Sequence, residues 1–276
     1  MSGKLYLVAT PIGNLEDITL RALNVLKEVD IIAAEDTRHT LGLLNHFEIK
    51  KPLISYYKEI EKTKSNQLIK ELKDGKNIAV VSDAGTPGIS DPGEEIVKKA
   101  IEEGIDIIPI PGACAFVNAL IASGFSTKEF SFIGFLPVNK KEKKDKLESI
   151  KNETRTLIFY EAPHKMKATL EAFLEVLGNR RIVLARELTK IHEEFIRSTI
   201  EEVLEKEEYK GEFVILIEGS EISKEDMELK NLNEMTLEEH YQKYEQEGLS
   251  KKDIIKRIAK DRNVNKNEIY QYFLDK

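Results

Sequence analysis

The chain of 276 residues has no tryptophan, one cysteine, five histidines and no apolar run long enough to cross a membrane. Cys114 therefore has no partner for an internal disulfide, and the histidines do not fall at the spacings of metal ligands, so we expect no structural metal. A membrane span needs about 18 consecutive apolar residues, and we expect no membrane partner. The first residues lead directly into an apolar strand without the regions of a signal peptide, which predicts a cytoplasmic protein.

An excess of positive charge is also absent. The formal net charge is -7, and 33% charged with 41% hydrophobic residues is typical of a globular protein. Any contact with nucleic acid must therefore come from local basic patches, and we expect no DNA partner. One patch spans 139–151, with six lysines against three acidic residues, and a second contains Arg180, Arg181, Arg186 and Lys190. The alternative interpretation of both patches is a solvated charged face.

Two common phosphate-binding motifs are missing. The chain contains no G-x-x-x-x-G-K-[ST] motif, and the loop after the first strand lacks G-x-G-x-x-G, so a nucleoside triphosphate or NAD is not expected as the ligand. Four loops instead follow apolar strands, at 10–14, 35–38, 82–93 and 111–115. Because the carboxyl ends of parallel strands meet at one edge of a sheet, these loops predict a ligand site at that edge.

Apolar strands alternate with helical patterns in the first half of the chain, which predicts an α/β fold with a mostly parallel sheet. We assign this first domain to residues 1–124. We expect strands at 5–9, 31–34, 78–81 and 105–110, and helices at 18–27, 62–73, 93–103 and 113–123. Within the 82–93 loop, Pro92 and Glu94 follow Asp91 as in a capping box, so we expect a helix to begin at Asp91.

A second α/β domain is assigned to residues 125–222. The segment 194–199 comes too soon after the strand at 182–185 for a parallel crossover, which predicts a mixed sheet. Residues 223–235 are polar and aperiodic, as in a linker. Residues 236–276 contain three candidate helix starts, and the last two helices, at 251–262 and 266–274, have helix-turn-helix spacing. We expect Ala259, Val264, Ile269 and Tyr270 in the core of this module, which is equally compatible with a contact to RNA or to protein.

Several runs of sequence resemble one family. The segments LYLVATPIGNLEDITLRAL, AAEDTR, VSDAGTPGISDPG, PIPGACA, FIGFLP, FYEAPH, ARELTK and GEFVIL occur in the order found in the ribosomal RNA small subunit methyltransferase I family, within the tetrapyrrole methylase superfamily. The resemblance implies two α/β domains with a cofactor cleft between them and a helix-turn-helix-like extension. It also implies a homodimer that uses S-adenosylmethionine to methylate the ribose 2'-oxygen of a cytidine in the decoding region of 16S ribosomal RNA, in the small ribosomal subunit.

The resemblance also implies which residues hold the cofactor. The expected set is Pro11, Gly13, Asp83, Ala84, Gly85, Thr86, Cys114, Ala115, Tyr160 and Glu161. Cys114 stands where the family commonly has serine, and we interpret it as a packed residue because methyl transfer from a sulfonium needs no covalent enzyme intermediate. We interpret Asp91 as a helix cap.

A base that takes the proton of the ribose hydroxyl would assist the transfer. The candidates are Glu187 and Lys190 in ARELTK, with Asp36 and Arg38 in AEDTR, although each is also compatible with a plain ion pair. The lysines at 140, 141, 143 and 144 are candidate phosphate contacts. Two other functions stay open at this point: a methyltransferase of the same superfamily that acts on a precorrin ring or another small molecule, and a non-catalytic RNA-binding protein that senses S-adenosylmethionine.

Overall fold

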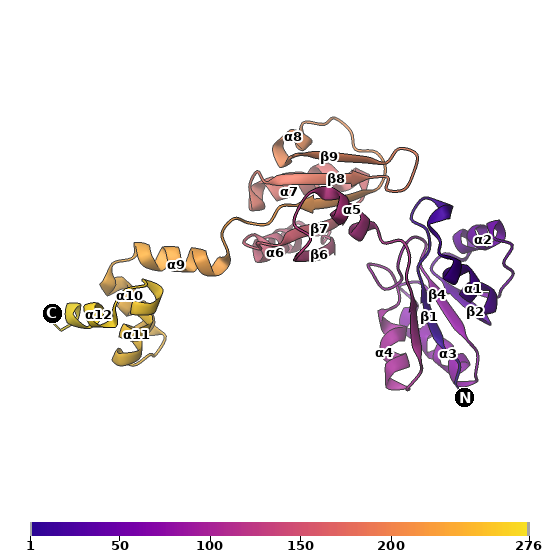
Figure 1. Cartoon of the computed structure of the whole chain (residues 1–276), viewed down its shortest axis with the longest axis horizontal. Coiled ribbons are helices and arrows are strands. Elements are labelled where there is room, and N and C mark those ends of the chain that lie inside the picture. Colours follow the sequence, from indigo (N-terminus) through magenta and orange to yellow (C-terminus); the bar gives the residue numbers. More distant parts are fainter. Residues whose placement is uncertain (1, 275–276) are drawn as a thin grey trace. The chain divides into compact units, whose positions relative to one another are not determined.

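The computed structural model describes residues 2–274, which form two compact units. The first unit comprises residues 1–148 and 156–218 and contains two sheets. The second comprises residues 149–155 and 219–276. Figure 1 shows the path of the chain through these elements. None of the described helices is both long and apolar enough to span a bilayer.

The first sheet is wholly parallel, as expected. Its strands are β1 (Leu5–Val8), β2 (Ile31–Ala34), β3 (Leu53–Ser55), β4 (Ile78–Val81) and β5 (Ile107–Ile110), in the order β3-β2-β4-β1-β5. All residues of β2 and β4 are buried, because helices cover both faces of a parallel sheet. The loops that follow β1, β2, β4 and β5 therefore leave the sheet at a single edge.

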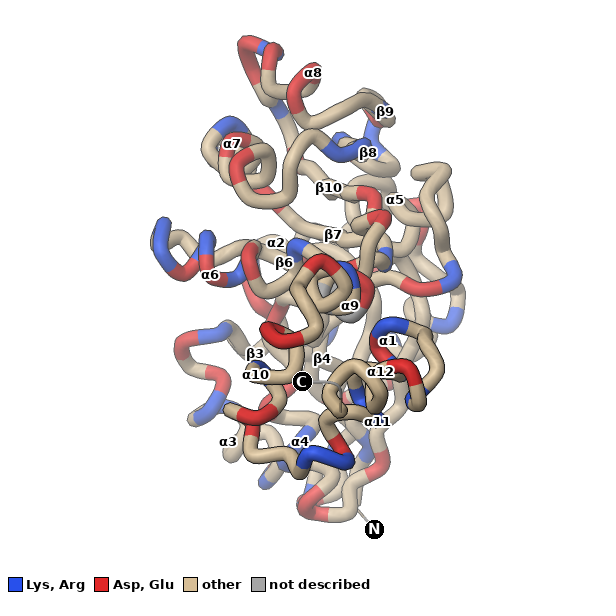
Figure 2. The backbone as a smooth tube through the Cα atoms, turned by 90° about the vertical axis from the view of Figure 1, so that its left-hand side faces the viewer, with Lys and Arg blue, Asp and Glu red and all other residues tan. Residues whose placement is uncertain are grey.

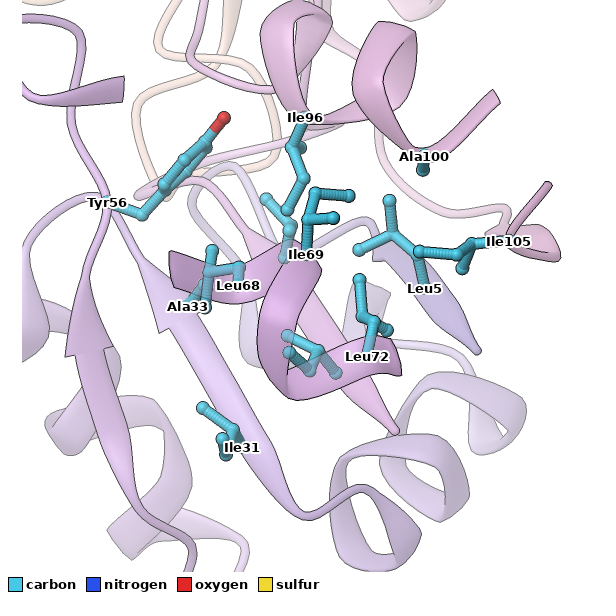
Figure 3. Packing of buried hydrophobic residues seen from close by; sticks show 12 residues of the cluster. Leu5, Ile31, Ala33, Tyr56, Leu68, Ile69, Leu72, Ile96, Ala100 and Ile105 are labelled. Atoms are coloured by element: carbon cyan, nitrogen blue, oxygen red, sulfur yellow. The ribbon is translucent and has the colours of Figure 1, made fainter. Parts of the chain in front are cut away.

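Helices pack on both faces of the first sheet. On one face lie α1 (Leu20–Glu28) and α2 (Thr37–His46), and on the other lie α3 (Glu61–Lys73) and α4 (Glu94–Glu102); a short turn of 3-10 helix, η1 (Leu15–Asp17), follows β1. Figure 3 shows Leu68 and Leu72 of α3 and Ile96 of α4 directed toward Leu5 and Ala33 of the sheet. Burial of each such side chain contributes about 1.5–3 kcal/mol, and these contacts hold the strand ends in place.

Two local expectations for this domain were incomplete or wrong. The helix after β4 begins at Glu94 rather than Asp91, because Gly93 occupies the N-cap position with a φ of 150° and no side chain caps the helix. Helix α2 and strand β3 were not predicted. Helix α2 contains Gly42 and few apolar residues, so its periodic signal is weak, and β3 has only three residues.

The second sheet is mixed, which confirms the prediction from strand spacing. Its strands are β6 (Phe130–Phe135), β7 (Thr156–Glu161), β8 (Arg181–Arg186), β9 (Glu194–Thr199) and β10 (Phe213–Ile217), in the order β6-β7-β10-β8-β9. Only the β6–β7 pair is parallel. Its helices are α6 (Lys140–Ile150), η2 (Pro163–Lys165), α7 (Met166–Leu177) and α8 (Ile200–Leu204).

Helix α5 (Ala115–Ser123) packs on the second sheet, although its sequence was assigned to the first domain. Ala119 and Leu120 contact the face that contains Val183 and Val214. Within the same unit, α7 contributes Phe173, whose ring centroid lies 4.8 Å from that of Phe159 in β7. The chain therefore passes from β5 of the first sheet into a helix of the second, and the loop between them joins the two halves of the unit.

The second unit contains four helices. They are α9 (Lys224–Glu234), α10 (Leu237–Gln246), α11 (Lys251–Asp261) and α12 (Lys266–Tyr272). The linker expected at 223–235 thus contains α9, which starts at the N-cap Ser223. Thr236 and Glu239 form a complete capping box on α10, as expected, whereas Ser250 and Asn265 cap α11 and α12 through single side-chain contacts.

The core of the second unit contains Ile254, Ile258, Ala259 and Ile269. Val264 and Tyr270 were expected in this core but are 39% and 46% exposed. Helix α12 packs through Ile269 and Phe273, which are four residues apart and share a face, so Tyr270 is turned outward. Helices α11 and α12 retain the helix-turn-helix spacing that the sequence predicted.

Candidate cofactor site

Three loops at the carboxyl edge of the first sheet are joined by hydrogen bonds. Thr10 and Gly85 form a β-bridge, with N–H···O distances of 2.8 and 3.1 Å in the two directions. The Thr86 hydroxyl donates to the carbonyl of Ala113 at 3.1 Å. Gly85 has a φ of 88°, and a side chain there would approach Ile12. The glycine therefore allows the loops after β1, β4 and β5 to meet.

These loops border a cavity of about 430 Å³ within the first unit, which also has a wall from the second sheet. Its residues are Ile12, Ala84, Gly85, Thr86, Ile89, Ser90, Asp91, Cys114, Ala115, Phe135, Tyr160, Glu161, Ala162, Pro163, Ala185, Leu188, Glu212, Phe213 and Val214. The lining set contains three carboxylates but no lysine, arginine or histidine. The cavity is therefore suited to a largely apolar ligand with positive charge and unsuited to a phosphate.

Seven of the ten expected cofactor residues line this cavity: Ala84, Gly85, Thr86, Cys114, Ala115, Tyr160 and Glu161. The other three lie just behind it. The Asp83 carboxylate accepts the backbone N–H of Asp36 at 2.9 Å. Gly13 packs against the loop after β8, where a side chain at this position would lie 3.1 Å from the carbonyl of Leu188. Pro11 precedes Ile12, which reaches the cavity in its place.

Tyr160 and Glu161 are held firmly at the end of β7. The Tyr160 hydroxyl accepts the backbone N–H of Phe116 at 3.2 Å, and burial raises its pKa. One Glu161 oxygen accepts the N–H of Ala162 at 2.9 Å, and the other accepts the Thr169 hydroxyl at 2.7 Å. Both side chains are therefore fixed as parts of the wall.

Cys114 precedes α5 and lies beside Thr86 and Ala115 in the cavity wall. Burial raises the pKa of its thiol, although contacts to backbone N–H groups oppose the shift. The thiolate that a nucleophile needs is therefore disfavoured, in keeping with the interpretation of Cys114 as a packed residue.

Glu187 and Lys190, the first pair of candidate catalytic residues, do not line the cavity. A Glu187 carboxylate oxygen accepts the backbone N–H of Glu212 at 2.8 Å and the Lys190 ammonium at 3.1 Å, and the first of these contacts is the main cause of its lowered pKa. Burial alone would lower the pKa of Lys190, but its bonds to Glu212 and Glu187 raise it. Both groups are charged and paired, which favours a role in fixing the loop.

Asp36 and Arg38, the second pair, are arranged as a helix cap. The Asp36 carboxylate accepts the backbone N–H of Arg38 at 2.8 Å, caps α2, and also binds the Arg38 guanidinium. The side-chain bond to Arg38 is the main cause that lowers the pKa of Asp36 to about 2. The Arg38 side chain is 90% exposed. Neither residue lines the cavity.

Sequence reasoning missed the side chains that complete the wall. Leu188 lies within the ARELTK run, Glu212 within the GEFVIL run and Phe135 within the FIGFLP run. The most consequential is Asp91, which was interpreted as a cap but lines the cavity. Burial, with the negative charges of Glu35 and Asp83, raises the pKa of Asp91 to about 7. The sequence Asp91-Pro92-Gly93-Glu94 resembles a capping box, which is why Asp91 was interpreted as a helix cap and not as part of the cavity wall.

The sequence of this chain matches a family model described as Tetrapyrrole (Corrin/Porphyrin) Methylases over residues 4–204. It is also 51% identical, over 276 aligned residues, to Ribosomal RNA small subunit methyltransferase I of Halalkalibacterium halodurans, with 98% of this chain and 94% of the relative covered. The chain belongs to the ribosomal RNA small subunit methyltransferase I family. This membership confirms the resemblance and makes the protein a methyltransferase.

Two further proteins are similar to this chain, one in sequence and one in fold. A Ribosomal RNA small subunit methyltransferase I of Thermotoga maritima is 46% identical, and 79% of this chain covers 100% of it. The solved structure of uroporphyrin-III C-methyltransferase from Thermus thermophilus, complexed with S-adenyl homocysteine, is 18% identical and has a TM-score of 0.57, with 78% of this chain and 97% of that chain covered. The second likeness shows the shared tetrapyrrole methylase fold.

The cofactor of this methyltransferase is S-adenosylmethionine, and the cavity fits it. A volume of about 430 Å³ lies within the range of about 300–1,000 Å³ for sites that hold molecules of this size. The three carboxylates and the lack of basic side chains in the wall favour its sulfonium and ammonium charges. When bound, the cofactor supplies an electrophilic methyl group. The small residues Ala84, Gly85 and Ala115 expose backbone groups to it.

Proposed function

We propose that this protein transfers a methyl group from S-adenosylmethionine to the ribose 2'-oxygen of a cytidine in the decoding region of 16S ribosomal RNA. We further propose that the substrate is the small ribosomal subunit and that the enzyme acts as a homodimer. The observation that carries the proposal is family membership over nearly the whole chain, joined to a cavity whose wall contains seven of the residues that the family resemblance implied.

In this proposal the ten expected cofactor residues act in two ways. Those in the wall contact the cofactor, and Pro11, Gly13 and Asp83 fix the loops behind it. The Asp83 carboxylate does so by bridging to the backbone of Asp36 after β2, and Gly13 does so by allowing close approach of the loop at Leu188. Positioning of this kind supports catalysis because in-line transfer requires the acceptor oxygen to approach the methyl carbon opposite the sulfur.

The acceptor RNA requires positive charge outside the cavity, since the wall supplies none. Helix α6 contributes lysines, which alternate with acidic residues along it (Figure 2). Lys143 donates to the Thr169 hydroxyl and Lys144 pairs with Glu175, which leaves Lys140 and Lys141 as the exposed pair best placed for phosphates. The proposed docking surface is therefore narrower than the run of four lysines that the sequence suggested.

The homodimer is supported by the outer face of α5. This helix is apolar on nearly all sides, yet Val117 and Ile121, four residues apart, are 42% and 69% exposed. Phe130 at the edge strand β6 is also exposed, and its ring contacts Phe116 of α5. A second copy of the chain would cover this apolar face, because monomers rarely leave such groups in water together.

The proposal is tested by a choice of acceptors. The protein is incubated with radiolabelled S-adenosylmethionine and, in parallel, with undermodified small ribosomal subunits, free ribosomal RNA and a tetrapyrrole. We expect label in the RNA of the subunit. Label in the tetrapyrrole would favour the small-molecule reaction instead, and cofactor binding without transfer to any acceptor would favour the sensor.

A further inference from the structure

Asp91 lies on the cavity side of the long loop after β4, in a backbone conformation that is costly to maintain. Ser90 has a φ of 68°, and the flanking Gly88 and Gly93 also have positive φ, at 81° and 150°. A serine in the left-handed region is unfavourable by roughly 1–2 kcal/mol. The Ser90 hydroxyl lies beside Gly134 of β6, where an added Cβ would be 3.3 Å from it. Strain of this kind persists where the fold positions a side chain for a function.

Among the described residues, the charges that act on Asp91 are negative. The Ser82 side chain lies beside its carboxylate, and the charges of Glu35 and Asp83 act on it. The titratable groups around the loop are Glu35, Glu61, Asp83, Cys114, Tyr160 and Glu161, of which Glu61 accepts the backbone N–H of Gly93 at 2.8 Å. Burial, with the negative charges of Glu35 and Asp83, explains why the pKa of Asp91 is raised to about 7.

The other two carboxylates in the wall are already engaged. Both oxygens of Glu161 accept hydrogen bonds, from Ala162 and Thr169. The Glu212 carboxylate pairs with Lys190 at 2.9 Å, and its side chain is 80% exposed. An efficient general base at neutral pH needs a pKa close to the working pH, and its side chain must line the site. Asp91 lines the cavity and has a pKa raised to about 7, so it meets both conditions.

We propose that Asp91 is the general base that accepts the proton of the ribose 2'-hydroxyl. This inference rests on the proposed function. As the ribose oxygen forms its bond to the methyl carbon, the methyl–sulfur bond breaks and its electron pair stays on sulfur. The hydroxyl proton passes to the Asp91 carboxylate. The products are the 2'-O-methyl ether, S-adenosylhomocysteine and protonated Asp91, which returns its proton to solvent.

The test compares Asp91→Asn with the wild type in single turnovers on undermodified small subunits, with saturating S-adenosylmethionine. We expect the rate to fall at least about 100-fold, within the usual range for loss of a general base. Asp74→Asn is the matched control, because Asp74 is an exposed aspartate at the opposite end of β4, and it should keep the wild-type rate. Because S-adenosylhomocysteine lacks the sulfonium charge, its binding, measured by calorimetry, should change by less than about threefold.

Two further readouts separate a base from a structural residue. The wild-type single-turnover rate should rise with pH to a plateau, with a midpoint at or below about 7, because a nearby sulfonium favours the ionised carboxylate. In Glu35→Gln the midpoint should move to lower pH, since one negative charge beside Asp91 is gone. The Glu35→Gln measurement tests the role of Asp91 even if Asp91→Asn does not fold. A midpoint that stays at the wild-type pH in Glu35→Gln overturns the assignment of Asp91 as the base.

The outcomes are distinguishable from those for the proposed function. A wild-type protein that methylates the subunit, with an Asp91→Asn variant within about fivefold of its rate, overturns the role of Asp91 alone. A variant that loses S-adenosylhomocysteine binding together with the rate assigns Asp91 to cofactor binding and overturns its role as a base. A wild-type protein that transfers no methyl group to the subunit overturns both proposals together.

Discussion

Replacement of Asp91 by asparagine should stabilise the protein increasingly as the pH rises. The pKa of Asp91 is about 7 in the folded protein against an ordinary value of 3.8. Between these values the folded state binds more protons than the unfolded state, so stability falls as pH increases through this window and is constant above it. The asparagine variant has no such carboxylate, so its stability does not fall through this pH window for that reason. A loss of the Ser82 contact would shift its stability equally at every pH.

The magnitude follows from the part of the shift that lies between pH 5 and pH 8, about two units. At 1.36 kcal/mol per unit this is roughly 2.7 kcal/mol, and solvent screening of a partly exposed carboxylate reduces it to about 1.5 kcal/mol. Calorimetric melting of both proteins should show the variant gaining about 4 °C over the wild type from pH 5 to pH 8. A melting difference that stays constant or reverses across this range would refute the charge environment described for Asp91.

Four other variants test separate parts of the structure. Phe159→Ala should cost about 3–5 kcal/mol of unfolding free energy, measured by urea denaturation, because the ring is fully buried against α7. Gly13→Ala should weaken S-adenosylhomocysteine binding in calorimetry, since a Cβ would lie 2.5 Å from Lys190 and push two cavity loops apart. Ile121→Asp should halve the mass measured by light scattering. Lys140→Gln with Lys141→Gln should reduce the salt dependence of subunit binding in filter-binding assays.

Controls for these substitutions come from the same chain. Leu20→Ala removes an exposed leucine from α1 and should leave stability within about 0.5 kcal/mol of the wild type. Gly42→Ala introduces a Cβ into open space and should leave cofactor affinity unchanged. Lys27→Gln with Lys70→Gln removes two exposed lysines elsewhere and should retain the wild-type salt slope. Equal effects of control and test substitutions would contradict the corresponding assignment.

The fold could be predicted from the sequence where periodicity was strong. Strands β2, β4 and β9 have the bounds that the sequence indicated. The parallel and mixed character of the two sheets also followed from segment spacing. Helix α2 and strand β3 were not predicted, because their sequence signals are weak. Helix α2 contains Gly42, and β3 has only three residues, too few to show a period. The packing of α5 on the second sheet depends on contacts far apart in the chain, which spacing alone does not reveal.

The site was predictable only in part, because motifs identify loops more readily than they identify which side chains face a cavity. Residues 84–86 and 114–115 line the wall as expected, but in the first loop Ile12 lines it rather than its neighbours Pro11 and Gly13. Glu187 has a φ of 50°, and its carboxylate binds the backbone of Glu212 instead of lining the cavity. Asp91 is free to face the cavity because Gly93, rather than Asp91, is the N-cap residue of α4. These orientations depend on backbone dihedral angles that composition does not specify.

The central claim is that the ribose oxygen of a cytidine in the small-subunit RNA receives the methyl group. The most direct measurement digests the RNA of treated, undermodified subunits to nucleosides and identifies the labelled product by liquid chromatography and mass spectrometry. We predict 2'-O-methylcytidine, at one methyl group or less per subunit, with no label on the bases. Label on a base, on another nucleoside, or on ribosomal protein in place of RNA would contradict the account.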